Sequence, residues 1–110
     1  MDIKDLGTGI KALTPAGRMT VGRELQRIEW QVEELVRQGA SKLIMDLSQV
    51  DYIDSAALGV LVACTSKARE VGGTLRICGV TDRVQKILDL TGVTRVLDLS
   101  GTLEEAKAAL

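Results

Sequence analysis

Apolar residues recur at helical spacing in the segment from Thr20 to Gln38. Between Thr20 and Gln38 they follow one another at alternating intervals of four and three residues, which places them on one face of a helix. Gly39 is well placed to end this helix. The predicted inward positions are Val21, Leu25, Ile28, Val32 and Leu35.

Three further helices are predicted downstream. One covers 55–71 and is closed by Gly72-Gly73, and another follows a cap at Thr81 or Asp82 and ends at Gly92. In the last, Thr102 and Glu105 form a capping box that opens a helix with Leu103, Ala106 and Leu110 facing inward.

Strands are predicted between the helices. The segment KLIMDL at 42–47 is almost continuously apolar, as in a strand covered on both faces, and TLRICGV at 74–80 alternates. Near the N-terminus we expect a strand that ends near Gly17, with Pro15 at an edge or bulge. Shorter strands are expected around 3–6 and 95–99.

The alternation of strands and helices implies crossover connections and therefore a largely parallel sheet. We predict a single α/β domain over residues 1–110, with a mixed, largely parallel β-sheet and about four helices. A chain of 110 residues buries enough surface to fold without a metal or disulfide. With one Trp, one Tyr and no Phe, its core must be aliphatic.

Charge and hydropathy exclude several classes of partner. The net charge is −1 with basic and acidic residues interspersed, and aromatic residues are too few to stack on bases, so we expect no nucleic-acid binding. The longest uncharged apolar run, Ala56 to Cys64, is too short to cross a bilayer. The first residues do not resemble a signal peptide, so we expect a cytoplasmic protein with no membrane association.

Residues for common catalytic chemistry are missing. The chain contains no His, and Cys64 and Cys78 form no CxxC pair, so neither a usual zinc site nor a His-containing triad is expected. No phosphate-binding loop is present, and we expect no cofactor and no enzymatic activity. Asp46 ends a strand, as the phosphoacceptor aspartate of a receiver domain does, but the chain lacks the acidic pair and the lysine of that fold. We therefore expect Asp46 to cap a turn or brace the loop before Ser55.

The segment DYIDSAALGVL at 51–61 poses a specific question. Asp54 is a good N-cap for the helix that follows, because its carboxylate can accept free backbone N–H groups of the first turn. Ser55 then occupies the first helical position, where its hydroxyl is not needed for the cap and points to solvent. Ser55 is therefore a candidate for chemistry.

The outer side of this helix carries small residues where charged ones are usual. At 100° per residue, Ala56, Gly59 and Ala63 lie opposite the apolar face, where a solvated helix would carry charges. A glycine costs roughly 1 kcal/mol relative to alanine inside a helix, so a close approach by another molecule would explain Gly59. The alternative is that this side also packs inside the domain. The predicted inward residues are Ala57, Leu58, Leu61, Cys64, Thr65 and Ala68.

The segment IDSAALGVL resembles the serine-bearing signature of STAS domains in the branch of anti-sigma-factor antagonists, usually Asp-Ser-Ser-Gly-Leu-Gly. The likeness extends to GRMT at 17–20, KLIMDLSQVDYIDS, residues 69–93 and the closing LEEAKAAL. Ala56 and Ala57 depart from the usual Ser and Gly, which bears on the choice of kinase. The poorly formed first strand bears on dimerisation.

This resemblance implies that a partner anti-sigma factor serine kinase phosphorylates Ser55 and that a serine phosphatase reverses the modification. The expected partner-binding residues are Asp54, Ser55, Ala56, Gly59 and Ala63. The resemblance implies an anti-sigma-factor antagonist, a partner-switching regulator that binds the kinase when unphosphorylated and is released when Ser55 is phosphorylated. We expect a monomer or weak homodimer.

A second function class stays open, because relatives of this fold also act as non-switching scaffold subunits of signalling or lipid-transport assemblies. Trp30 is a further oddity, since it points away from the apolar face of its helix. It either makes a contact with another molecule, as Trp often does at binding hot spots, or lies across its own helix surface.

Overall fold

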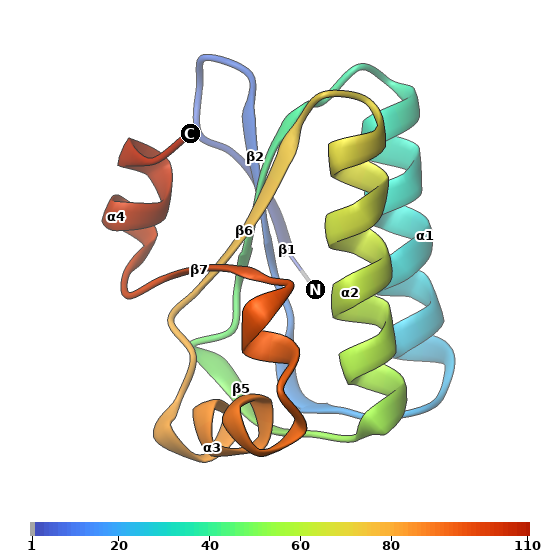
Figure 1. Cartoon of the computed structure of the whole chain (residues 1–110). Helices are drawn as coiled ribbons and strands as arrows, with labels where there is room; N and C mark the ends of the chain where they lie inside the picture. Colours follow the sequence, from blue (N-terminus) through green and yellow to red (C-terminus); the bar gives the residue numbers. More distant parts are fainter. Residues whose placement is uncertain (1) are drawn as a thin grey trace.

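A computed structural model describes residues 2–110 as an α/β domain built on a five-stranded sheet (Figure 1). The strand order is β1-β2-β4-β6-β7; β1 is antiparallel to β2 and the other neighbours are parallel. The mixed, largely parallel sheet is therefore confirmed. The strands are β1 (Asp2–Asp5), β2 (Ile10–Thr14), β4 (Lys42–Asp46), β6 (Thr74–Cys78) and β7 (Asp98–Ser100).

Helices cover the two faces of this sheet unequally. Figure 1 shows α1 and α2 side by side on one face and the short α4 on the other, with α3 below the sheet. The larger core cluster lies under the paired helices and the smaller one under α4. The helices are α1 (Arg23–Arg37), α2 (Ser55–Glu70), α3 (Asp82–Thr91), the 3-10 turn η1 (Val93–Arg95) and α4 (Leu103–Ala108).

A second, two-stranded parallel sheet corrects the prediction for the N-terminal region. The strand expected to end near Gly17 is divided at Pro15, and its second part, β3 (Ala16–Met19), leaves the main sheet to pair with β5 (Gln49–Ile53). Residues 49–53 were expected to be only a connection. The separation occurs at Pro15, which cannot donate a ladder hydrogen bond. Within the β3–β5 pair the register shifts between Gly17 and Arg18.

The start of α1 also differs from the prediction. The helix begins at Arg23, and Val21, which was expected on its buried face, is 77 % exposed. Gly22 precedes the helix with a φ of 148°, a conformation that favours glycine. Val21 was assigned to the core because the apolar spacing continues to the N-terminal side of Arg23, where the helix begins.

Two boundaries near the C-terminus are resolved by caps. Thr81 caps α3 through its hydroxyl, which accepts a hydrogen bond from the Val84 N–H at 3.4 Å, and Gly92 ends α3 in the left-handed region. The final strand begins at Asp98 and not at Arg95, because Arg95 is the last residue of η1. Thr102 caps α4 by accepting a hydrogen bond from the Glu105 N–H at 3.1 Å, which is one of the two bonds of the predicted capping box.

The core is aliphatic, as the composition predicted. Cys64 and Cys78 are buried free thiols, and burial raises the pKa of Cys64 to about 12 and that of Cys78 to about 11. Neither thiol is therefore activated for nucleophilic chemistry at neutral pH. Over residues 2–110, no helix is both long and apolar enough to cross a bilayer.

Candidate functional site

Asp54 joins the start of α2 to the loop that follows β3. One carboxylate oxygen, Oδ1, accepts a hydrogen bond from the Ala57 N–H at 2.9 Å, and the other, Oδ2, accepts from the Val21 N–H at 2.8 Å. The Asp54 N–H donates to the Met19 carbonyl at 3.2 Å. The predicted N-cap is confirmed, while the bond to Val21 had no local signal in the sequence because 33 residues separate the partners.

These hydrogen bonds set the ionisation of Asp54. The Val21 N–H, and next the Ala57 N–H, stabilise the carboxylate and lower its pKa below the ordinary value of 3.8. Asp54 is therefore a fixed negative charge at neutral pH. Since backbone donors occupy both of its oxygens, it positions the chain beside Ser55.

Ser55 is the first residue of α2 and is exposed. The N-terminal end of α2 lies at the same lower end of the molecule as α3 (Figure 1). The N-cap carboxylate of Asp54 accepts the Ala57 N–H, but the first turn itself carries no acidic residue, so no side chain within that turn offsets the positive end of the helix dipole. The position can accept an anion on the serine without disrupting the helix.

The three residues predicted on the outer side of α2 do not share one environment. Gly59 is exposed, and a Cβ built there would meet no atom within 4 Å. Ala56 and Ala63 are half-buried, and Ala56 packs against the main core cluster. The packing alternative thus applies in part to Ala56, and of the three residues only Gly59 is exposed.

The neighbouring helix explains this difference. Lys67, four residues after Ala63, reaches across to α1, with its Nζ 2.8 Å from Glu33 Oε1 and 3.9 Å from Glu29 Oε2. The side of α2 that carries Lys67 therefore faces α1. The side open to solvent carries Ser55, Gly59 and Ser66 at intervals of four and seven residues, all of which are exposed.

A basic cluster that the sequence did not reveal is formed by residues of β3, β5 and α3. The guanidinium groups of Arg18 and Arg83 lie 4.5 Å and 5.6 Å from the centroid of the Tyr52 ring. Arg18 lies opposite Tyr52 in the register of β3 and β5, and Arg83 is in α3. The pairing of β3 with β5, which was not predicted, is what brings the first arginine to the ring.

The remaining candidates lie elsewhere. Asp46 accepts a hydrogen bond from the Ser48 N–H at 3.0 Å, which confirms its role in a turn. Trp30 is 58 % exposed on α1 and lines a shallow hollow together with Arg23, Arg27 and Glu33. Among residues 2–110, no group of three or more His, Cys, Asp or Glu side chains is arranged to hold a metal ion.

Comparison with known proteins places this geometry in context. The family model for the STAS domain matches residues 8–106. A Thermotoga neapolitana homologue of TM1081, assigned as an anti-sigma factor antagonist, is 32 % identical over 78 residues, which cover 71 % of this chain and 69 % of the relative. The anti-sigma-B factor antagonist of Bacillus subtilis is 34 % identical over 70 residues, covering 64 % of this chain and 63 % of the relative.

One solved structure is similar over nearly the whole chain. The Bacillus cell fate determinant SpoIIAA in its phosphorylated form superposes with a TM-score of 0.75 over 98 % of this chain and 96 % of that chain, at 16 % identity. At this level of identity the similarity shows a shared fold.

Proposed function

Because this chain belongs to the STAS domain family, among anti-sigma factor antagonists, we propose that it is a partner-switching regulator controlled by phosphorylation of Ser55. The observation that carries the proposal is an exposed serine at the first position of α2, beside an exposed Gly59 with open space around it. Two relatives carry names that refer to anti-sigma factors, which supports a protein partner of that class.

In the unmodified state the protein binds an anti-sigma factor serine kinase through the first two turns of α2, around the exposed Ser55 and Gly59, and Ser66 lies beyond this surface. Gly59 lets the partner backbone approach α2 closely, because no side chain stands there. Asp54 and the half-buried Ala56 and Ala63 border these two exposed residues and complete the partner-binding surface. Val21 is fixed next to this surface by Asp54 and supplies an exposed apolar side chain. Occupation of the kinase then frees the sigma factor, or a comparable regulator, that the kinase restrains.

Phosphorylation ends the complex through local electrostatics. A phosphoryl group on Ser55 adds roughly −1.5 to −2 charges at neutral pH, next to the carboxylate of Asp54. A partner that covers this position meets added bulk and a charge that it must desolvate. A coupling of about 2–3 kcal/mol would weaken binding some 30- to 150-fold. The fold is retained, because a helix N-terminus tolerates an anion.

The cycle needs two other enzymes. The kinase transfers the γ-phosphoryl group of ATP to Ser55 Oγ, whose proton is released, and ADP leaves. A serine phosphatase hydrolyses the phosphoserine to restore the hydroxyl and free phosphate. The protein itself is the substrate and the ligand of these enzymes, and not a catalyst.

The proposal is tested with the purified chain, its cognate kinase and ATP. We expect one phosphate per chain, located on Ser55, and none on Ser55→Ala. Ser55→Asp should bind the kinase at least tenfold more weakly than the unmodified chain. Ser66→Asp is the matched control, because Ser66 is also exposed on α2 and receives the same charge without the modification site.

Two results would contradict this function. Phosphate found elsewhere, with Ser55→Ala fully modified, would remove the acceptor. Equal binding by the unmodified chain and Ser55→Asp would favour the alternative of a non-switching scaffold subunit, which binds its assembly irrespective of Ser55.

A further inference from the structure

Two arginines and one aromatic ring form a compact cluster built from β3, β5 and α3. Arg18 of β3 and Arg83 of α3 approach the Tyr52 ring of β5, so that elements distant in sequence bring two cations to one ring. Contact with an aromatic face holds a guanidinium in a limited set of positions. Less freedom is then lost when the guanidinium binds an anion.

The hydrogen-bond donors of these arginines are not committed to acids of the same chain. Within residues 2–110, neither Arg18 nor Arg83 forms a salt bridge. The carboxylate of Asp54 is occupied by backbone N–H groups and does not compete for them. Each guanidinium has five donors in a planar fork, which matches the oxygens of a phosphoryl group.

The cluster lies close to Ser55 along the chain and through the small sheet. Tyr52 precedes Ser55 by three residues, so their Cα atoms are at most about 11 Å apart. Met19, the residue after Arg18, accepts the hydrogen bond from the Asp54 N–H at 3.2 Å. The strand that carries Arg18 is therefore bonded directly to the residue before Ser55.

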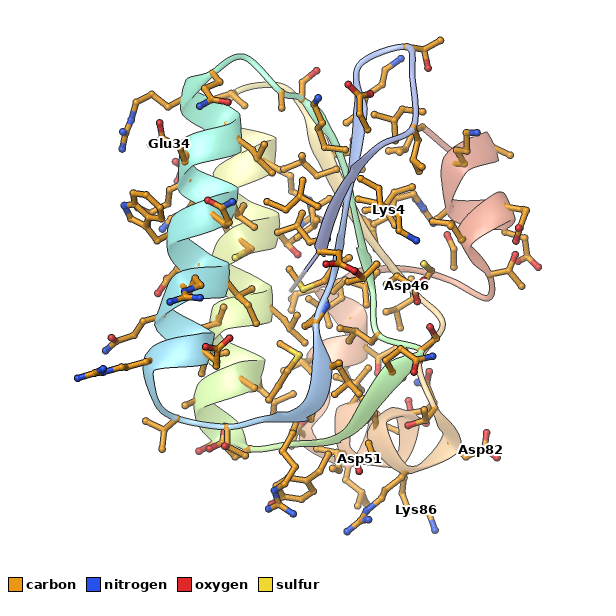
Figure 2. The ribbon with its side chains drawn as sticks, turned by 180° about the vertical axis from the view of Figure 1, so that it is seen from behind. Lys4, Glu34, Asp46, Asp51, Asp82 and Lys86 are labelled. Carbon is orange, nitrogen blue, oxygen red and sulfur yellow. The ribbon has the colours of Figure 1, made fainter. Side chains whose placement is uncertain are left out.

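The other charges at this end do not replace the arginines. Figure 2 shows Asp51 of β5 with Asp82 and Lys86 of α3 at the lower end of the molecule. The two acids would repel a phosphoryl group. Lys86 is a single exposed cation one turn beyond Arg83 and offers no planar fork.

We propose that Arg18 and Arg83 together bind the phosphoryl group on Ser55. This inference rests on the proposed function, since it names the groups that receive the modification. The arginines neutralise part of the added charge and hold the phosphate over Tyr52, which gives the phosphorylated surface one defined arrangement. The same contacts restrict the approach of a phosphatase to the phosphorus atom.

The test uses the full chain with phosphoserine incorporated at position 55 during translation, so that no kinase is needed. The second pKa of the phosphate is measured by a ³¹P NMR pH titration in the wild type and in the double variant Arg18→Gln/Arg83→Gln. Favourable contact with the dianion lowers this pKa, so we expect the wild type to titrate at least about half a unit below the double variant, whose value should be near 6. Arg95→Gln, at an exposed arginine in η1, should titrate like the wild type.

Equal phosphate pKa values in the wild type and the double variant would overturn the inference. Far-UV circular dichroism verifies the fold of each protein, and single variants provide the comparison if the double variant does not fold. This readout is separate from the proposed function, because it requires neither partner nor kinase. If the chain fails to bind a kinase while the phosphate pKa still differs between the wild type and the double variant, the proposed function is rejected and the phosphate site stands.

Discussion

The first two turns of α2 and its last two turns are held in place differently. From Ser55 to Val62 the helix carries no charge, and Ser55 and Gly59 are exposed. From Ala63 to Glu70 it is tied to its neighbours by ion pairs, from Lys67 to Glu33 at 2.8 Å and from Arg69 to Asp98 at 3.1 Å. Only the inward face, with residues such as Leu61, is buried in both halves.

The contrast separates stability from recognition within one helix. The last turns supply cross-links to α1 and β7, while the first turns are anchored from below by Asp54 and leave their outer side open. Substitutions on the outer side of the first turns should therefore change binding with little loss of stability, and substitutions beneath them should do the opposite.

The largest expected effect comes from removing the shared support of both halves. Leu61 is fully buried, so Leu61→Ala should lower the free energy of unfolding by about 2–5 kcal/mol through lost burial and a cavity. Urea denaturation measures this loss. Val62→Ala is the matched control, because Val62 is only half-buried and should lose less. An equal loss in the two variants would show that the inward face does not support the helix as described.

A smaller effect should follow from removing the anchor below the first turn. Asp54→Ala leaves the N–H groups of Ala57 and Val21 without their acceptor and should lower the Tm by a few degrees at neutral pH. Because the pKa of Asp54 is lowered on folding, its stabilisation is present above pH 3.8 and is lost as the pH falls through the folded pKa.

The stability difference between wild type and Asp54→Ala should accordingly shrink below about pH 3.8, as measured by thermal unfolding at a series of pH values. Asp5→Ala serves as a control for an exposed acid of lowered pKa, here through Lys11, that does not touch α2. A difference that stays constant down to pH 2 would show that the Asp54 charge plays no part.

The smallest change in stability, and the sharpest test of the contrast, is Gly59→Ala. The added methyl group meets no atom of the chain, so helix propensity should raise the free energy of unfolding by up to about 1 kcal/mol. Binding to the kinase should nevertheless weaken, because the methyl group occupies the space left for the partner backbone. Ser66→Ala is the control, because Ser66 is exposed on α2 but lies beyond the first two turns, and it should leave binding unchanged. If Gly59→Ala is stable and binds the kinase as well as the wild type does, Gly59 is not part of the interface.

Much of the fold and part of the candidate site followed from local patterns. The spacing of apolar residues located the helices, and the caps at Asp54, Thr81 and Thr102 were readable because each bonds to a residue three positions away. The same spacing misplaced Val21, since a periodic pattern does not show where backbone hydrogen bonding stops.

The β3–β5 sheet was missed because strand pairing joins residues more than thirty positions apart and its strands are short. The Arg18–Tyr52–Arg83 cluster depends on that pairing and on the position of α3, so it had no signature in the sequence. The helical wheel likewise grouped Ala56 with Gly59, because it contains no information about which side α1 covers.

The sequence by itself determined the order of the four helices and of the main-sheet strands, the aliphatic core and a serine at the N-terminus of a helix, because propensity, periodicity and capping act over a few neighbouring residues. The tertiary structure decided which side of that helix stays open, which distant N–H binds Asp54 and which cations gather around Tyr52. Those features arise from contacts between segments far apart along the chain, and packing in three dimensions alone brings such segments together.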